Sequence, residues 1–379
     1  MRLLKDVAPA PTGPPLSIVA PARNEARGIE AAIRSLLRLD YPGLEIVVVN
    51  DRSTDDTGAI LERIAREVPL EEVRLTTSAE ASALKKPDTT APRLATAPRL
   101  TVITISELPG GWLGKNYAMH VGAANASGEL LLFTDADIVF EPSTLRRAVA
   151  YMLAQRVDHL AAIPDIRLTG AALKAFVAAF GVFFSMYARP WKVRDPRSRA
   201  HIGVGAFNLI RAEVYRAIGT HRAIAMRPDD DMKLGKLVKK HGFRQDVVFG
   251  QDFIVVEWYA SLRELIDGLM KNAFAGVEYS LWATVGATAG LLLMNVWPFI
   301  GLLVTGGLSR MLYAASVLFI VLIFWTVNGR RVAYVVGFPA AAVLFAYIMW
   351  RSALVAVTRG SIEWRGTEYP LAAMRANRI

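Results

Sequence analysis

The apolar run Leu130–Phe133 ends abruptly in the polar sequence T-D-A-D (134–137). A short, continuous apolar run is typical of a strand buried on both faces, as in a parallel sheet. Open α/β sheets bind ligands at the carboxyl ends of their strands, so Asp135 and Asp137 are expected at a binding edge. Two such carboxylates suit Mg²⁺ or Mn²⁺, which share oxygen ligands with substrate phosphates. A polar turn that caps the next helix is the competing interpretation, because D-x-D is a common sequence.

Polar clusters also follow two earlier predicted strands. Leu16–Pro21 leads into A-R-N-E (22–25), and Leu44–Val49 leads into N-D-R-S-T-D-D-T (50–57). Further elements are predicted as helices over 29–39, 57–67 and 114–126, and as strands over 100–105 and 159–164. Alternating strands and helices of this kind predict an α/β fold with a parallel sheet.

The next part of the chain holds three less regular features. Residues 171–193 crowd aromatic side chains onto one helix, which either lies in a membrane interface or packs in a core. We predict that this helix is too short and interrupted to span a bilayer. The Gly-rich sequence 201–208 is predicted as a strand and loop near the site. The helix over 229–240 begins with three acids, of which at least one can serve as a cap.

Three long apolar runs, about 284–305, 311–327 and 332–357, follow a predicted amphipathic helix over 257–280. Each run is near the length that crosses a hydrocarbon core of about 30 Å. Pro298 and Pro339 would kink two of them, and one run is a candidate for a re-entrant segment. Three full spans would place the Arg residues of the tail outside, against the usual bias, so the side of the tail stays open.

Composition limits the classes of function. The chain has 379 residues, a net charge of +10 and no cysteine, which excludes disulfides, thiolate nucleophiles and Cys-ligated zinc. After Val285 there are eight Arg, no Lys and two Glu, a pattern that favours anionic lipid headgroups over nucleic acid. The Pro-rich N-terminus has no apolar signal segment, so the sheet domain is expected on the cytoplasmic face of a multi-pass inner-membrane protein.

These features predict a division of the chain. We expect a disordered lead-in over 1–15 and a sheet domain over 16–256 that contains a loop insertion over 77–99. An interfacial helix over 257–282, a transmembrane region of about three helices over 283–358 and a tail over 359–379 complete the prediction.

The three polar clusters would meet at one edge of the sheet and form a pocket suited to a nucleotide diphosphate. A metal ion and Lys115 would neutralise the pyrophosphate, and Asp51 would accept a hydrogen bond from the base or ribose. There is no G-x-x-x-x-G-K-[ST] sequence, which argues against ATP hydrolysis. The first strand is not followed by G-x-G-x-x-G, which argues against a dinucleotide-dependent dehydrogenase.

Several motifs together resemble the inverting family 2 glycosyltransferases with the GT-A fold, a Rossmann-like sheet domain. They are P-A-R-N-E (21–25), V-N-D-R-S-T-D-D-T (49–57), G-W-L-G-K (111–115), F-T-D-A-D (133–137) and D-D-M-K-L-G (230–235). Membrane-bound members that glycosylate lipids are the most similar, including ceramide glucosyltransferase-like and carotenoid- or hopanoid-associated types. The tail sequence W-R-G-T-E-Y (364–369) also looks like theirs.

The resemblance implies a nucleotide-sugar donor, usually a UDP-sugar, together with Mg²⁺ or Mn²⁺. It implies a nucleotide-sugar site made of Pro21, Arg23, Asn24, Glu25, Asp51, Ser53, Gly114, Lys115 and Asp135. Asp135 and Asp137 would hold the metal, and Asp231, with Asp230 beside it, would be the base that activates the acceptor hydroxyl. The implied partners are the donor, a lipid or membrane-associated acceptor and membrane lipids, but not nucleic acid.

One family motif, Q-x-x-R-W, is not found, which counts against processive synthesis of a polysaccharide. Trp112, Trp258 and Tyr259 are candidates for stacking on the acceptor, although a core position suits an aromatic residue equally well. Two other functions stay open on the residues alone. The first is a sugar-1-phosphate nucleotidylyltransferase, and the second is a non-catalytic membrane assembly partner.

Overall fold

The computed structural model describes residues 2–69, 73–79 and 98–379, and it divides the chain into two compact units. The first contains residues up to Arg167 and Pro190–Glu257, and the second contains Leu168–Arg189 and Trp258–Arg378. The predicted 77–99 insertion lies mostly outside the described residues. The predicted sheet domain, 16–256, therefore differs from the observed unit at both of its ends and over 168–189.

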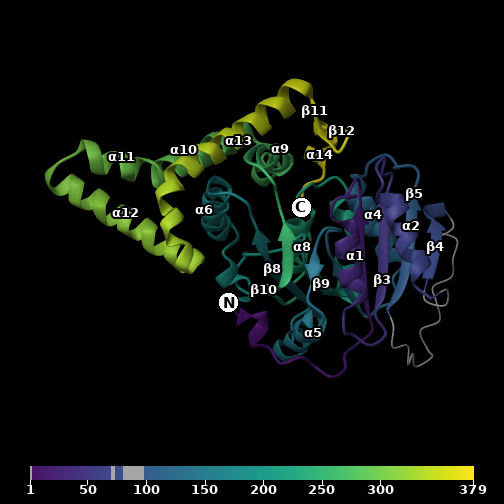
Figure 1. The fold of residues 1–379 in the computed structure, drawn as a ribbon. Coiled ribbons are helices and arrows are strands. Elements are labelled where there is room, and N and C mark those ends of the chain that lie inside the picture. The colour runs from purple at the N-terminus through teal and green to yellow at the C-terminus, as the bar shows by residue number, and fades with distance from the viewer. Residues whose placement is uncertain (1, 70–72, 80–97) are drawn as a thin grey trace. The chain divides into compact units, whose positions relative to one another are not determined.

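The first unit is built on one mixed sheet (Figure 1), and its strands follow the spatial order β1-β10-β8-β9-β6-β2-β3-β5-β4 with β7 beside β10. Their bounds are β1 Arg2–Leu3, β2 Leu16–Ala22, β3 Glu45–Asp51, β4 Val73–Thr77, β5 Arg99–Ile105, β6 Leu130–Phe133, β7 Val139–Phe140, β8 His159–Arg167, β9 Asn208–Arg211 and β10 Gln245–Glu257. Strands β6, β2, β3, β5 and β4 run parallel, and β9 is antiparallel to β6 and β8. The predicted α/β class is confirmed.

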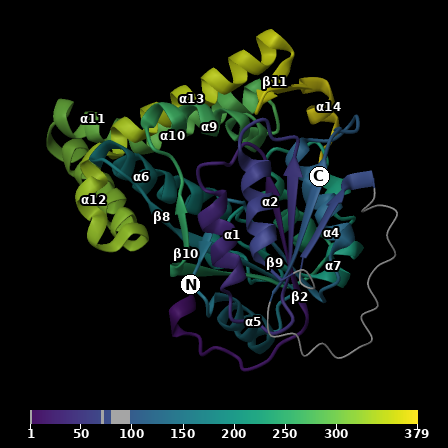
Figure 2. The same cartoon turned by 45° about the vertical axis from the view of Figure 1, so that its right-hand side comes forward.

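Helices cover both faces of this sheet, because alternate residues of its buried strands point to opposite sides. Ile18, Ile46 and Val48 pack in one apolar cluster with the helices over 29–37, 57–67 and 144–155, whereas Val47 and Val49 pack against the helix over 114–125. Figure 2 shows α1 and α2 side by side over one face. The helices are α1 Ile29–Leu37, α2 Thr57–Glu67, α4 Gly114–Asn125, α5 Thr144–Gln155, α7 Ala212–Ala217 and α8 Asp230–Lys240.

The structure corrects the prediction of a disordered lead-in. Arg2–Leu3 form β1, which pairs with β10 in parallel, and Leu4 is fully buried. Further along, the Tyr41 hydroxyl donates a hydrogen bond to the Pro14 carbonyl oxygen. A composition rich in proline obscured a segment that the sheet and α5 hold in place, since Arg147 also donates to the Val7 carbonyl oxygen.

The second unit is almost entirely helical. Its elements are α6 Ala171–Ala188, α9 Leu262–Ala273, α10 Leu281–Asn295, α11 Trp297–Val304, α12 Gly307–Asn328, the 3-10 segment η6 Gly329–Gly337, α13 Phe338–Arg359, the hairpin β11 Ser361–Trp364 and β12 Thr367–Pro370, and α14 Leu371–Ala376. The predicted run 284–305 is broken at Val296, where a new helix begins at Trp297 with Pro298 in its first turn.

Within the described residues, three helices are long and apolar enough to cross a membrane: Ala171–Lys192, Gly307–Asn328 and Val332–Arg359. Two of them match predicted runs. The third is the 171–193 segment, so the prediction that this segment is too short for a span is wrong on length and composition.

Candidate functional site

The site lies at the carboxyl edge of the parallel strands. Asp51 ends β3, and Asp135 and Asp137 follow β6 after Thr134. The register pairs Pro21 with Val49 and Val19 with Phe133, so the three strands end close to one line. The sequence therefore places the three predicted polar clusters along one edge.

Asp51 is buried and held by two guanidinium groups. Arg52 donates to both carboxylate oxygens, at 2.7 and 3.1 Å, and Arg23 Nη1 lies 3.6 Å from Oδ2. Gly114 at the start of α4 packs against this carboxylate so closely that a Cβ atom there would collide with Asp51 Oδ2. Glycine is needed at 114 for this close approach, and Arg52 is a functional candidate that the motif reading missed.

The loops after β2 and β3 are tied to each other by side-chain to backbone hydrogen bonds. Asn24 N donates to Ser53 Oγ at 3.1 Å, and Thr54 N donates to Asn24 Oδ1 at 2.8 Å. Glu25 N donates to Thr57 Oγ1 at 2.8 Å. Asn24 takes a φ of 53°, which Asn tolerates better than most residues. In this structure Asn24 and Ser53 shape the loop pair.

Lys115 joins the D-x-D turn to the acid pair at the start of α8. Its Nζ lies 2.8 Å from Asp135 Oδ1 and 3.4 Å from Asp230 Oδ2. Burial lowers the pKa of Lys115, but the neighbouring carboxylates of Asp135, Asp230 and Asp231 outweigh it, so the pKa is raised. The three carboxylates therefore favour the charged form of Lys115 at the point where these acids meet.

The Gly-rich loop 203–205 connects the same two acidic segments from the other side. Gly205 N donates to Asp231 Oδ2 at 3.0 Å, and Asp135 N donates to the Gly205 carbonyl oxygen at 3.0 Å. A Cβ atom on Gly205 would collide with Asp135 Oδ2. The sequence predicted a strand and loop over 201–208, but the strand begins only at Asn208, and the loop is the part that contacts the site.

Two carboxyl groups in this cluster have strongly perturbed pKa values. Burial first, and then the adjacent Asp230 carboxylate, raise the pKa of Asp231 to about 7. Burial first, and then Asp135 and Glu25, raise the pKa of Asp137 to about 7. A carboxyl pKa raised toward neutral pH is what a general base needs. At Asp137, burial and then the crowded negative charge of Asp135 and Glu25 raise the pKa, and a bound cation would stabilise the ionised carboxylate.

Of the acids at the start of α8, Asp231 accepts a hydrogen bond from Met232 N in the first turn, whereas Asp229 has another role. Asp229 at the N-cap position makes no side-chain capping hydrogen bond. Instead it pairs with the fully buried Arg227 at 2.9 Å and with Lys233 at 3.4 Å. Asn116 Nδ2 donates to three carbonyl oxygens of the loop before α8, those of Ile224, Ala225 and Arg227. Sequence reasoning missed this anchoring, since nothing in G-K-N marks Asn116 as a partner of a loop about 110 residues away.

The donor set fits a divalent cation only with help from a ligand. Among the residues that the structure describes, no group of three or more Asp, Glu, His or Cys side chains is arranged to hold a metal ion. Asp135 and Asp137 supply two carboxylates, and Mg²⁺-type sites commonly complete their shell with substrate phosphates and water. The chemistry of this turn therefore fits a metal that arrives with a diphosphate.

The predicted aromatic residues each pack against another ring of their own unit. Trp112 packs against Tyr117 and His120 of α4, with ring centroids 5.5 and 5.0 Å away. Trp258 and Tyr259 belong to the second unit, where Trp258 packs 5.7 Å from Phe180. A role for these three residues in acceptor binding stays a prediction.

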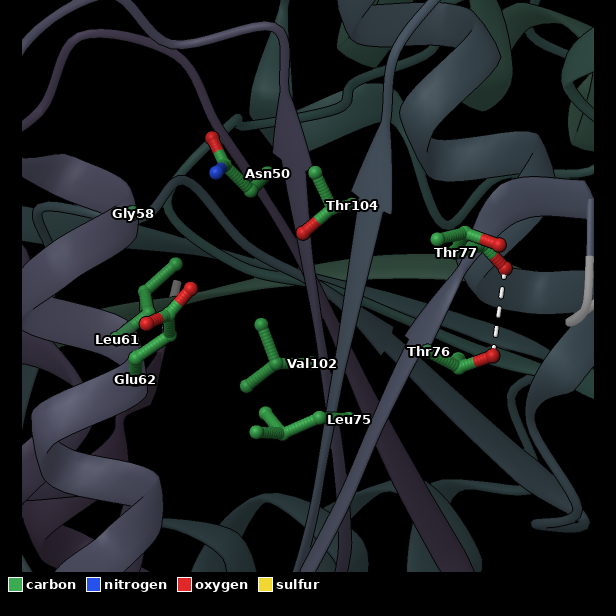
Figure 3. A pocket seen from close by; sticks show the side chains of 9 residues that line it. All are labelled: Asn50, Gly58, Leu61, Glu62, Leu75, Thr76, Thr77, Val102 and Thr104. Carbon is green, nitrogen blue, oxygen red and sulfur yellow. Dashed lines mark hydrogen bonds between the residues drawn. The ribbon is translucent and has the colours of Figure 1, made fainter.

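A separate cavity of about 340 Å³ opens on the α2 face of the sheet (Figure 3). Asn50, Gly58, Leu75 and Thr104 are among the residues that line it. Neighbouring strand residues point to opposite faces, so Asn50 belongs to this cavity whereas Asp51 faces Gly114. The cavity is therefore distinct from the acidic edge.

A parallel-rich sheet with a D-x-D turn after one strand, a buried Asp at the end of another and a lysine between Asp135 and Asp230 agrees with the predicted GT-A type. A family model described as "Glycosyltransferase like family 2" matches residues 14–257. The chain belongs to this family and is a family 2 glycosyltransferase.

Two relatives illustrate the similarity. The chain is 21% identical over 368 residues to a 4,4'-diaponeurosporenoate glycosyltransferase of Staphylococcus aureus (strain MRSA252). This match covers 94% of the chain and 88% of the relative. The solved structure of the mannosyltransferase PcManGT from Pyrobaculum calidifontis, in complex with GDP-Man and Mn²⁺, has a TM-score of 0.51 and 21% identity. That match covers 93% of this chain and 89% of the other, and it shows a shared fold.

Proposed function

We propose that this glycosyltransferase moves a sugar from a nucleotide diphosphate sugar, most simply a UDP-sugar, to a hydroxyl group of a lipid or membrane-associated acceptor. The observation that carries the proposal is the Lys115 bridge, with Nζ 2.8 Å from Asp135 and 3.4 Å from Asp230. It brings the turn suited to a diphosphate and the acid pair suited to proton removal to one place. Family membership favours this function over nucleotidyl transfer and over a non-catalytic role.

The roles of the residues follow from their surroundings. Asp51, buried at the end of β3, would accept a hydrogen bond from the base or ribose while Arg23 and Arg52 fix its orientation. Lys115 would stabilise negative charge on the departing diphosphate. Asp231 would remove the proton of the acceptor hydroxyl in the transition state, because an alcohol is a poor nucleophile until a base takes that proton.

Asp135 and Asp137 would hold Mg²⁺ or Mn²⁺. When bound, the metal would act as a Lewis acid that offsets the charge of the leaving diphosphate. A base on the face opposite the leaving group makes the displacement in-line, so the product would have the inverted anomeric configuration.

The acceptor class rests on the second unit and on one relative. Three helices long and apolar enough to cross a membrane indicate membrane association. The similar relative is named for a diaponeurosporenoate, which supports an apolar acceptor. We place the sheet unit on the cytoplasmic face of the cell membrane, where nucleotide sugars are made.

A thermal-shift screen of UDP- and GDP-sugars tests the donor. Ligands that bind only the folded protein raise its apparent stability, by about 2.7 kcal/mol at a concentration of 100 times Kd. We expect one nucleotide sugar to raise the Tm when Mn²⁺ is present and to lose most of this effect in EDTA. The control is the Asp56→Asn variant, which changes an exposed acid in the loop between β3 and α2. This variant should show the same shifts in Tm as the wild type. A folded protein that no nucleotide sugar stabilises would contradict the proposal.

A further inference from the structure

Helix α6 cannot cross a bilayer, although it is long and apolar enough to do so. Only three residues separate its start from Arg167, the last residue of β8, and Pro190 just after it again belongs to the sheet unit. Strands β8 and β9, on either side of α6 in the sequence, are neighbours in one sheet. Both ends of α6 are therefore on the side of the sheet, because three extended residues reach about 10 Å and a hydrocarbon core measures about 30 Å.

Helix α9 is tied to the same side by a short connection. It begins at Leu262, and only four residues separate it from Glu257 at the end of β10. Four extended residues reach about 14 Å, which is too short to cross the hydrocarbon core. The Trp258 ring in this connection packs 5.7 Å from Phe180 of α6, so the two tied helices are also neighbours.

Helix α13 contacts α6 with its first half. Phe338 lies 5.2 Å from Phe183 of α6, and Phe345 lies 5.8 Å from Phe180, measured between ring centroids. Residues that are buried on one face of α13 extend from Phe338 to Ala356. Its packed face therefore runs along nearly the whole helix.

The second half of α13 contacts α9. Arg351 Nη1 lies 2.9 Å from Asp267 Oδ1, and Ser352 Oγ donates to the Met270 carbonyl oxygen. A helix that touches α6 near its start and α9 near its end, both tied to the sheet side, has neither end across the bilayer.

The tail returns to the same place. Lys271 of α9 lies over the ring of Trp364 in β11, with Nζ 4.3 Å from the ring centroid. Arg375 of α14 donates to the Tyr279 carbonyl oxygen, in the connection that follows α9. The hairpin β11–β12 and α14 thus share the side on which α9 lies.

Helices α11 and α12 form an apolar hairpin that leaves this cluster and returns to it (Figures 1 and 2). Trp297 Nε1 donates to the Tyr313 hydroxyl at 3.0 Å, which joins the two limbs, and Asn328 Nδ2 donates to the Ala178 carbonyl oxygen of α6 at 3.1 Å. Large apolar side chains near the turn are between 61% and 79% exposed: Leu303, Val304, Leu308, Met311 and Leu312. Several large apolar side chains that are exposed next to one another indicate a surface that binds lipid or another protein.

We infer that the α11–α12 hairpin enters the bilayer from the face on which the sheet unit lies and returns to that face. The partner of this surface is lipid, and α6, α9, α13 and the tail stay on the entry side. The charges agree with this placement: of the eight Arg residues after Val285, only Arg310 lies near the turn, and the other seven fall on the entry side. Three full spans would instead put the tail and its Arg residues on the opposite side.

Single-cysteine labelling tests the inference directly, because the chain contains no cysteine and has no background signal. Four variants report on four positions: Glu213→Cys in the sheet unit, Ala333→Cys in η6, Glu368→Cys in the tail and Gly306→Cys at the turn of the hairpin. Each full-length variant is labelled with a membrane-impermeant maleimide in right-side-out and inverted vesicles.

Glu213→Cys defines the side of the sheet unit. We expect Ala333→Cys and Glu368→Cys to react from that side alone and to the same extent as Glu213→Cys. Gly306→Cys should not react from that side until detergent is added. Reaction of Ala333→Cys or Glu368→Cys from the opposite side would overturn the inference, because α12 or α13 would then cross with its ends separated.

A spin label on Gly306→Cys tests whether lipid is the partner. If the label lies within the bilayer, we expect it to collide more often with O₂ than with a water-soluble nickel chelate. If the turn reaches the opposite surface, the chelate should contact the label only from the side opposite the sheet unit. A label that neither reagent reaches would mean that protein covers the hairpin, and reaction of Gly306→Cys from the sheet side would mean that it is not inserted. Either result would overturn the inference, whichever sugar the enzyme transfers.

Discussion

Replacing Asp231 by Asn should lower kcat by about 10²–10⁴-fold while the protein stays folded, because the acceptor hydroxyl loses the base that takes its proton. Asn keeps the shape of the side chain, but its single carbonyl oxygen can accept from only one of the two backbone N–H groups that Asp231 binds, those of Gly205 and Met232. A thermal melt of the variant therefore accompanies the rate measurement. The measurement is the initial rate of sugar transfer at saturating donor. Binding of the nucleotide sugar, followed by thermal shift, should change little.

The pH profile separates a base from a merely structural acid. Burial and Asp230 raise the pKa of Asp231 to about 7, so wild-type kcat/KM should rise as the pH increases through about 7. Asp230→Asn should move this rise to lower pH, since Asp230 raises the pKa of Asp231 more than any other carboxylate does. Lys115→Met should move it to higher pH, because Lys115 lowers the pKa.

The same shift has a consequence for stability. The folded-state pKa lies above the ordinary carboxyl value of about 4, so ionisation of Asp231 weakens the folded state. Its contribution makes the free energy of unfolding fall as the pH rises from about 4 to about 7, and Asp231→Asn should remove that part of the slope. A variant with wild-type kcat and an unchanged pH profile would show that Asp231 is not the base.

Replacing Asp137 by Asn is expected to cost about 10²–10³-fold in rate, the size typical of losing one group that stabilises transition-state charge. The Mn²⁺ concentration for half-maximal activity should rise as well, because one of the two proposed carboxylate ligands is lost. Initial rates measured after EDTA treatment, with Mn²⁺ added back in steps, give both quantities.

Asp56→Asn provides the matched control for this variant. Asp56 is an exposed acid in the neighbouring loop, and its replacement should leave the rate and the Mn²⁺ requirement unchanged. If Asp137→Asn also keeps the wild-type rate and Mn²⁺ requirement, the metal role assigned to this turn is wrong.

The sequence could predict the elements whose signals are local. Leu130–Phe133, Glu45–Asp51 and Thr57–Glu67 agree with the predicted strands and helix within two residues, because buried apolar runs and helical periodicity show in short windows. The position of the acids that follow these strands could be predicted as well, since a parallel sheet puts the carboxyl ends of its strands at one edge.

Other features depend on long-range contacts and were missed for that reason. β10 was not predicted, because residues 245–257 mix Asp, Gly and Gln with apolar residues, and its order comes from pairing with β8. The burial of Leu4 likewise depends on partners distant in sequence. The bridges through Lys115, Gly205 and Asn116 join segments about 20 to 110 residues apart, which no local pattern reveals.

The membrane region shows the limit of composition as a guide. Hydropathy counts apolar residues but does not register what joins the two ends of a helix. The 171–193 segment has the length and composition of a span, yet both of its ends lead into one sheet. The connectivity of the folded chain, which composition does not record, is the basis for our inference that this segment does not cross the bilayer.

The structure of the protein with UDP and Mn²⁺ bound is the most direct test of the account. We expect the metal in contact with Asp137 and a diphosphate oxygen, the diphosphate beside Lys115, and the base or ribose beside Asp51. A nucleotide bound instead in the cavity lined by Asn50 and Thr104, on the opposite face of the sheet, would contradict it.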